Sequence, residues 1–251
     1  MAESSSNAGR CQRAAIIGYG PEARDQAVRL RAIGWSVDVV MRPGGMSWIQ
    51  AVTDGFRPVP AGEAAARADV VVIHLPEAEQ PAVWACVIAP HLAHGSLAVF
   101  AHGWALYSGA VEPDPGLDVV LVTDCDARGG TERMCRVAVH RDATGHALER
   151  AAAFARAIFG GSKIGTTTLE AEVRAELSKL VSKMGGLEAV LAEWDRVLAH
   201  PSHEPDQANL AYYEGLRAAV LAGGKPPEKP RSRVIRTELS RTGVSRKRGA
   251  A

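Results

Sequence analysis

The sequence lacks the features of a cysteine-based metal site, of a secreted protein and of a membrane protein. Its four cysteines, Cys11, Cys86, Cys125 and Cys135, do not have metal-site spacing, and they are typical of a reduced protein. The opening residues, MAESSSNAGR, contain no apolar segment of the kind that a signal peptide requires. No apolar run is long enough to cross a bilayer. We therefore expect a cytoplasmic protein without a membrane partner.

The chain also lacks an excess of either sign of charge. Its 29 basic and 28 acidic side chains leave a formal net charge of +1, which gives no general reason to expect nucleic-acid binding. We find no internal repeat. With 251 residues, 47% of them hydrophobic, the chain is long enough for one large domain with a smaller companion.

The stretch from Ala14 to Arg42 has the pattern of a strand, a glycine turn, a helix and a second strand. Gly18-Tyr19-Gly20 leads to Ala23, which completes a G-x-G-x-x-A pattern, and Pro21 suits the first turn of a helix. The N-terminus of such a helix attracts anions, so the βαβ context predicts a dinucleotide site. The alternative is a tight turn without a ligand.

Apolar runs and helical patterns alternate as far as residue 160. The expected further strands are Asp69–Leu75, Leu97–Phe100, Asp118–Val122 and Arg136–His140, and expected helices include Glu77–His91 and Thr144–Phe159. This alternation predicts an α/β fold of the Rossmann type, with a doubly wound parallel sheet. We assign residues 13–162 to this dinucleotide-binding domain and residues 1–12 to a disordered leader.

The remaining chain has a different pattern. Residues 163–223 are expected to form a small all-helical C-terminal domain, with one helix from Thr168 to about His200 and another from Gln207 to Leu221. Residues 224–251 are basic and punctuated by proline, which predicts a flexible tail. The alternative for the tail is an arm that contacts an anion, a nucleic acid or a partner protein.

Three stretches together resemble ketol-acid reductoisomerase. They are IGYGPEARDQAVRLRAIGWSVDVVMRPGGMSW, LPEAEQPAVWACVIAPHLAHGSLAVFAHG and VAVHRDATGHALERAAAFARAIFGG. The family has a similar IGYG turn, a Leu-Pro-Asp-Glu-x-Gln helix, a Phe-Ala-His-Gly turn and an Ala-Val-His-Gln-Asp-Ala segment. The resemblance covers residues 13–187 and continues weakly to 222. It implies an NADPH-dependent enzyme that, in the family, also uses magnesium.

The resemblance and the residue chemistry together favour NADPH over NADH. Where NAD-binding proteins usually have a carboxylate, this chain has Arg42, whose planar cationic group suits a 2′-phosphate. Ser47 can add a hydroxyl, although the family's other loop serine is Gly45 here. NADH remains the alternative, and Arg42 would then be an ordinary exposed loop residue.

The resemblance implies a set of cofactor-binding residues along four segments of the chain. These residues are Gly18, Tyr19, Gly20, Pro21, Glu22, Ala23, Arg42, Ser47, Leu75, Pro76, Gln80, His102 and Gly103. His102 would lie beside the nicotinamide and the substrate, where an imidazole can donate or accept a proton near neutral pH. Alternatively, it is a buried histidine that orients a turn.

Most of the family's magnesium ligands are missing. The family's Asp-Leu-Phe-Gly-Glu segment aligns with Ala175 to Lys179, so its aspartate and its glutamate are replaced by alanine and lysine. In the later Glu-x-x-x-Glu pair, Glu214 is retained and the second position is Ala218. Glu176 is one residue from the aspartate position, about 100° round the helix, and cannot simply replace it. We expect no metal site and no magnesium requirement.

These observations favour an NAD(P)H-dependent reductase that acts on the C=N or C=O group of a small molecule without the isomerase step. His102 and Glu214 are the expected catalytic residues. One alternative is a genuine magnesium-dependent ketol-acid reductoisomerase of branched-chain amino-acid synthesis, and another is a non-catalytic NADP(H)-binding protein. The helical part is too short to bury itself alone, which predicts a homodimer through that domain.

Overall fold

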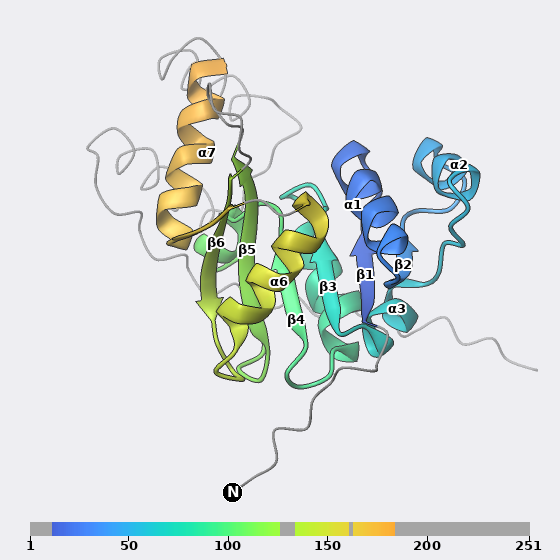
Figure 1. Cartoon of the computed structure of the whole chain (residues 1–251), viewed down its shortest axis with the longest axis horizontal. Helices are drawn as coiled ribbons and strands as arrows, with labels where there is room; N and C mark the ends of the chain where they lie inside the picture. The colour runs from blue at the N-terminus through green and yellow to red at the C-terminus, as the bar shows by residue number, and fades with distance from the viewer. Residues whose placement is uncertain (1–11, 126–133, 161–162, 184–251) are drawn as a thin grey trace, which may run out of the picture. The chain divides into compact units, whose positions relative to one another are not determined.

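A sheet of seven strands forms the core of the residues that the structure describes (Figure 1). The computed structural model describes residues 12–125, 134–160 and 163–183. The chain divides into two units, 1–196 and 197–251, and all described residues lie in the first. The strands lie in the order β2-β1-β3-β4-β5-β6-β7. Their bounds are β1 Arg13–Ile17, β2 Ser36–Val40, β3 Val70–Ile73, β4 Leu97–Phe100, β5 Asp118–Cys125, β6 Met134–Arg141 and β7 Lys163–Thr167.

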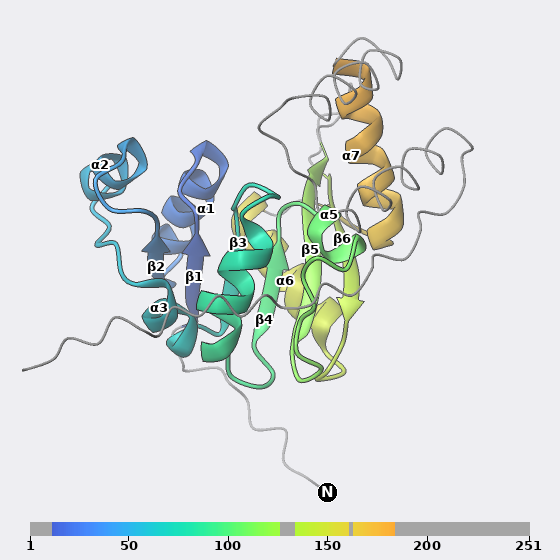
Figure 2. The ribbon, with the colours of Figure 1, turned by 180° about the vertical axis from the view of Figure 1, so that it is seen from behind.

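Helices cover both faces of the sheet, which confirms the predicted α/β class (Figures 1 and 2). Successive residues of β1 belong to different core clusters: Ile16 to that of Leu30 and Phe154, Ile17 to that of Trp84. Such alternation is expected of a strand that is buried on both faces. The helices of the first cluster include α1 Pro21–Ala32 and α6 Ala147–Phe159, and those of the second include α3 Ala61–Arg67 and α5 Trp104–Tyr107.

We predicted a parallel sheet, and the observed sheet is mostly but not wholly parallel. Strands β1 to β5 are parallel, β6 is antiparallel to β5, and β7 is parallel to β6. Only residues 126–133 separate β5 from β6. A parallel neighbour requires a crossover of about a dozen residues or more, so this short connection dictates the antiparallel pairing.

The helix predicted over Glu77–His91 is shorter and irregular. Helix α4 spans Gln80–Val83 and continues as a π-helical turn, η1 Trp84–Ile88, and a 3₁₀ turn, η2 Ala89–His91. Proline explains both changes, because Pro81 is tolerated only in the first turn and Pro90 has no N–H to continue the α-helical pattern.

The sheet extends beyond the expected domain boundary at residue 162. Lys163–Thr167 pairs with β6 as strand β7, and its threonine and isoleucine side chains favour this extended form. Helix α7, Leu169–Lys183, then follows where a helix was predicted. None of the described helices is long and apolar enough to cross a membrane. The leader, the later expected helix and the basic tail lie outside the described residues.

Gly18 holds three strands together at the carboxyl end of β1. Its N–H donates to the carbonyl oxygen of Val40 at 2.8 Å, and its φ of +96° is one that other residues rarely adopt. A Cβ at this position would lie 2.6 Å from the carbonyl oxygen of His74. In contrast, Gly20 has a φ of −75° and no atom within 4 Å of the position that a Cβ would occupy.

We predict that Gly18→Ala and Gly20→Ala differ in how strongly they affect stability. Gly18→Ala is expected to lower the free energy of unfolding by about 2 kcal/mol or more, because it combines backbone strain with a clash. Gly20→Ala should change it by less than about 1 kcal/mol. Urea denaturation followed by circular dichroism measures both, and equal effects would contradict this account of the turn.

Candidate functional site

The candidate site lies at the carboxyl edge of the parallel strands, where the strand order reverses. From β1 the sheet extends to β2 on one side and to β3 on the other. In open α/β sheets the loops diverge at such a point and leave a crevice that commonly binds a ligand. The turns that follow β1, β2, β3 and β4 carry nearly all the residues expected to bind a cofactor.

The glycine turn presents an open helix N-terminus at this crevice. Gly20 is the N-cap of α1 and Pro21 occupies the first turn. Neither a capping side chain nor any atom near the Gly20 Cβ position closes this end. Backbone N–H groups and the helix dipole are therefore available to an anion such as a pyrophosphate.

Tyr19 and Ala23 support this turn from below. Ala23 is buried, and the buried Tyr19 donates a hydrogen bond from its hydroxyl to Asp54 at 2.9 Å. Arg24 also binds Asp54, at 2.6 and 2.8 Å, and holds the pKa of that carboxyl well below its usual range. Burial and the Asp54 carboxylate raise the pKa of Tyr19. The Tyr19 side chain thus joins the turn to helix α2, Met46–Thr53.

Arg42, at the end of β2, lies at a largely apolar pocket of about 460 Å³. Its side chain is 82% exposed, and its guanidinium contacts the carboxylate of Glu79 at 2.6 Å. Leu75 and Trp48 also line this pocket. Ser47 lies in the first turn of α2 but is not part of the lining. The pocket combines an apolar floor with one cation and one carboxylate.

Gln80 braces the loop that contains Leu75 and Pro76. It is 1% exposed, and its Nε2 donates to the carbonyl oxygen of Leu75 at 2.9 Å. Its backbone N–H donates to the carbonyl oxygen of Pro76 at 3.2 Å. The contribution of Gln80 in this structure is to fix the loop that forms one wall of the pocket.

His102 follows β4 and faces carboxylates from three elements. Its Nδ1 lies 3.0 Å from Oε1 of Glu176 on α7. This hydrogen bond raises the pKa of His102, and the nearby carboxylates of Glu77 and Glu22 add to the effect. The side chain is half exposed. The cationic form of this imidazole is therefore more favoured than that of a free histidine.

A second histidine at the same edge has the opposite electrostatic character. Burial, together with the charge of His102, lowers the pKa of His74 to about 4. The ring of His74 lies 2.9 Å from the side-chain oxygen of the buried Gln26. The site therefore contains one histidine that favours the charged form and one that stays neutral.

Glu77 connects the loop after β3 to the start of α5. One of its oxygens accepts the backbone N–H of Trp104 at 3.2 Å, and its other oxygen is buried without a hydrogen-bond partner. Burial raises the pKa of this carboxyl. Glu77 is thus a partly buried acidic neighbour of His102, and the sequence alone did not indicate it.

Gly103, expected to bind the cofactor, provides the contact surface for α7. A Cβ here would lie 2.9 Å from Leu169 and 3.0 Å from Val173. The missing side chain lets α7 approach the start of α5, which brings Glu176 to His102. Glu77 was visible in the Leu-Pro-Glu-Ala-Glu-Gln motif, but nothing in the sequence indicates which face of α7 would meet the site.

Some predicted site residues cannot be placed. Ala175 and Lys179 lie in α7 as expected, whereas Glu214 is outside the described residues. Among the residues that are described, no three His, Cys, Asp or Glu side chains form a group that could hold a metal ion.

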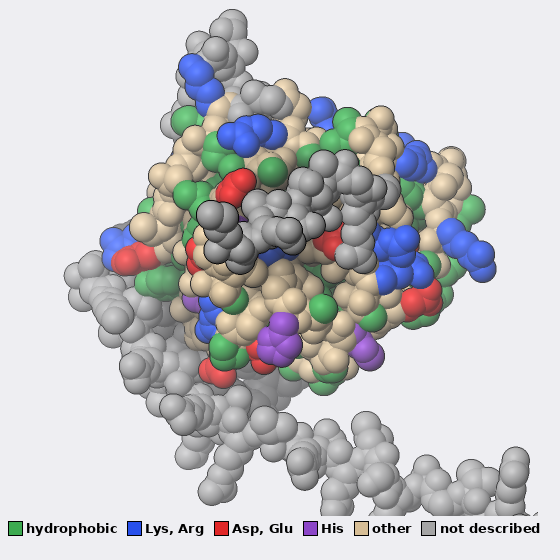
Figure 3. Space-filling model, turned by 60° about the horizontal axis from the view of Figure 1, so that its bottom comes forward, with side chains coloured by type: hydrophobic (Ala, Val, Ile, Leu, Met, Phe, Trp, Pro, Cys, Tyr) green, Lys and Arg blue, Asp and Glu red, His purple; other side chains and the backbone are tan. Residues whose placement is uncertain are grey.

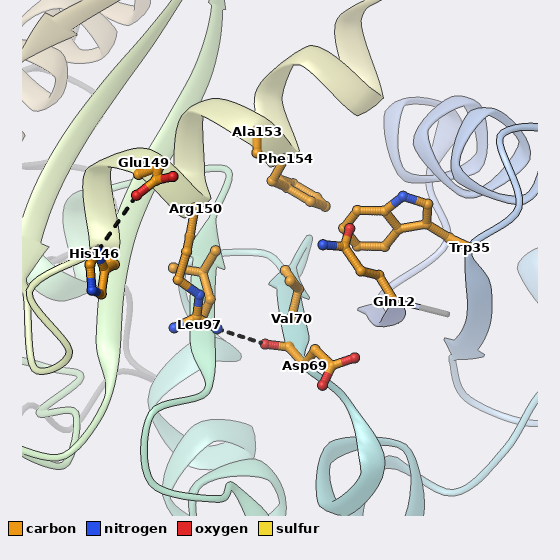
Figure 4. Close-up of a pocket in the computed structure, with 10 residues that line it drawn as sticks. All are labelled: Gln12, Trp35, Asp69, Val70, Leu97, His146, Glu149, Arg150, Ala153 and Phe154. Carbon is orange, nitrogen blue, oxygen red and sulfur yellow. Dashed lines mark hydrogen bonds and ion pairs between the residues drawn. The ribbon is translucent and has the colours of Figure 1, made fainter. Parts of the chain in front are cut away.

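A second pocket, of about 430 Å³, lies at the opposite edge of the sheet (Figure 4). Trp35 and Phe154 point toward one another across it, with ring centroids 6.0 Å apart. Arg150 is held by Asp118 at 2.6 Å and by the backbone oxygens of Gly95 and Asp69. Figure 3, which brings this end forward, shows basic and acidic side chains interspersed on the visible surface. Because the guanidinium of Arg150 already bonds to Asp118 and to two backbone oxygens, we assign this pocket a structural role.

Comparisons with known proteins identify the family of the sheet-containing part of the chain. The model of the acetohydroxy acid isomeroreductase NADPH-binding domain matches residues 10–165. Ketol-acid reductoisomerases (NADP(+)) from Pyrobaculum neutrophilum and Pyrobaculum arsenaticum are 38% identical over 218 residues and 37% identical over 222 residues. Each match covers 82% of this chain, which spans 65% of the length of these relatives.

Solved structures share the fold. An NADH-preferring ketol-acid reductoisomerase from an uncultured archean is 26% identical, with a TM-score of 0.60, covering 86% of this chain and 63% of that one. The 3-hydroxyisobutyrate dehydrogenase of Mycobacterium tuberculosis is 18% identical, with a TM-score of 0.54, covering 88% of this chain and 90% of the other.

Proposed function

The chain belongs to the ketol-acid reductoisomerase family, and from that premise we propose that it is an NADP(H)-dependent reductase of a small C=N or C=O compound. One observation carries the proposal. The open glycine turn and the protonatable His102 lie at the same edge of the sheet, on either side of the loop that follows β3. This arrangement would place a phosphate group and a reacting centre along one crevice.

The described residues fit a dinucleotide. The turn from Gly18 to Ala23 would hold the pyrophosphate, and the pocket at Leu75 would hold the adenosine. Arg42 would bind a 2′-phosphate after exchanging its contact with Glu79. Glu79 could instead accept a ribose hydroxyl, so NADH remains the alternative cofactor.

The bound nicotinamide would supply the hydride, and protein side chains would manage the proton. The acidic side chains that face His102 favour the iminium cation that forms when an imine accepts a proton, which makes an imine more suitable than a keto acid. His102 would donate the proton that the nitrogen or oxygen acquires. We propose that Glu214 holds a substrate ammonium group. We also propose that the enzyme is a cytoplasmic homodimer and that it acts in specialised metabolism.

The donors on α7 do not fit the family's magnesium site. Ala175 has no ligand atom and Lys179 is a cation, where carboxylate oxygens are the preferred ligands. We therefore propose that no magnesium ion takes part in the reaction. The second candidate function is that of a magnesium-dependent isomeroreductase. The observation in its favour is the identity of 37–38% to named ketol-acid reductoisomerases.

We predict NADPH oxidation with a small cyclic imine that is unaffected by EDTA, because protein donors rather than a metal would stabilise the developing charge. The decrease in NADPH absorbance measures the rate, with 2-acetolactate and magnesium as the comparison. Magnesium-dependent turnover of 2-acetolactate would replace this proposal with the second candidate. NADPH binding without turnover of any imine or keto acid would favour a non-catalytic binding protein.

We predict that Arg42→Glu weakens NADPH binding by about tenfold or more, because it removes a charge-assisted hydrogen bond to the 2′-phosphate. NADH binding should change much less. Fluorescence titration of both cofactors measures this difference, with Arg156→Glu on the exposed surface of α6 as the matched control. Equal changes for the two cofactors would contradict the role of Arg42.

A further inference from the structure

Helix α7 is held against the sheet by an apolar contact at the residue after His102. Leu169 and Val173 lie directly over Gly103, and Val173 is 2% exposed. Residues separated by three or four positions share one face of a helix. Glu176, three residues after Val173, therefore lies on the face that α7 turns toward His102.

A buried carboxylate also fixes the rotation of α7. Glu172 is 4% exposed and accepts hydrogen bonds from the Thr123 hydroxyl at 2.9 Å and from Arg136 at 3.0 Å. Thr123 belongs to β5 and Arg136 to β6, so this group joins α7 to two strands. Because Glu176 is four residues further along, its direction is set by two independent anchors.

We propose that Glu176 is a positioning residue for His102. Its carboxylate accepts the Nδ1–H of the imidazole, fixes the ring orientation and reserves Nε2 as the nitrogen that exchanges a proton with the substrate. This inference rests on the proposed reductase function.

The proposed proton transfer balances for an imine. The Nε2–H bond of the imidazolium breaks, a bond forms between that proton and the imine nitrogen, and the ring becomes neutral. A bound dihydronicotinamide would supply the hydride for the new C–H bond, and the π electron pair would become the lone pair of the amine nitrogen. The ring regains its proton from solvent. Glu176 stabilises the charged ring throughout but does not itself exchange a proton.

The other titratable groups around His102 do not reproduce this arrangement. Glu22 from α1 and Glu77 from the loop after β3 act on His102 through their charge. His74, at the end of β3, stays neutral because of its burial. Among the described residues that act on His102, Glu176 is the one with a direct side-chain hydrogen bond to the ring.

Proton NMR titration of the full chain, without cofactor or substrate, tests the proposal. In Glu176→Gln the pKa of His102 should fall by about 1. The ¹⁵N shifts should show that the neutral ring no longer carries its proton on Nδ1 alone. The matched control is Glu170→Gln, which removes an exposed carboxylate paired with Arg174 on the same helix. An unchanged pKa and tautomer of His102 in Glu176→Gln would overturn the proposal.

A second variant separates positioning from a purely structural role. Glu176→Asp keeps the carboxylate and should retain a raised His102 pKa, whereas kcat/KM near neutral pH should fall about tenfold in Glu176→Gln. A kcat/KM pH profile that is identical in the wild type and Glu176→Gln would also overturn it. Imine-dependent NADPH oxidation by the wild type tests the reductase function separately, because the histidine measurement needs neither cofactor nor substrate.

Discussion

The site depends on the close approach of β1 and β3 at Gly18. No side chain separates this residue from the backbone of His74, and its N–H bonds to the end of β2. The turn therefore begins at the point where the strand order reverses. From here α1 extends with an open N-terminus and the loop after β3 forms the wall of the Arg42 pocket. A side chain at Gly18 would disturb all of these elements together.

The charges at this edge suggest how a reductase could manage without a metal ion. The resemblance to the family implies carboxylates that hold magnesium, but this chain has Ala175 and Lys179 at two of those positions. The carboxylate of Glu176 instead contacts an imidazole and favours its charged form. In the proposed reaction, this histidine would supply the proton where a Lewis acid would otherwise be needed.

Local pattern was sufficient to predict the central sheet and the glycine turn, because apolar β-branched runs and the Gly18–Ala23 pattern depend on neighbouring residues. The reversed direction of β6 depends on how distant segments pair, which local pattern does not reveal. The short strand β7 lies beyond the domain boundary that composition predicted at residue 162. The contacts of Glu79 with Arg42 and of Glu176 with His102 join residues distant in sequence. The rotation of α7 depends on a missing side chain at Gly103, which sequence periodicity does not reveal.

The most direct test of the central claim is a crystal structure of the chain with NADP⁺ and a substrate analogue, grown with magnesium present. We expect the pyrophosphate at the Gly18–Ala23 turn, the nicotinamide beside His102, and Glu176 still bonded to the imidazole. No magnesium ion should lie between the nicotinamide and the analogue. A magnesium ion coordinated there by Glu214, or a cofactor bound away from the glycine turn, would contradict the account.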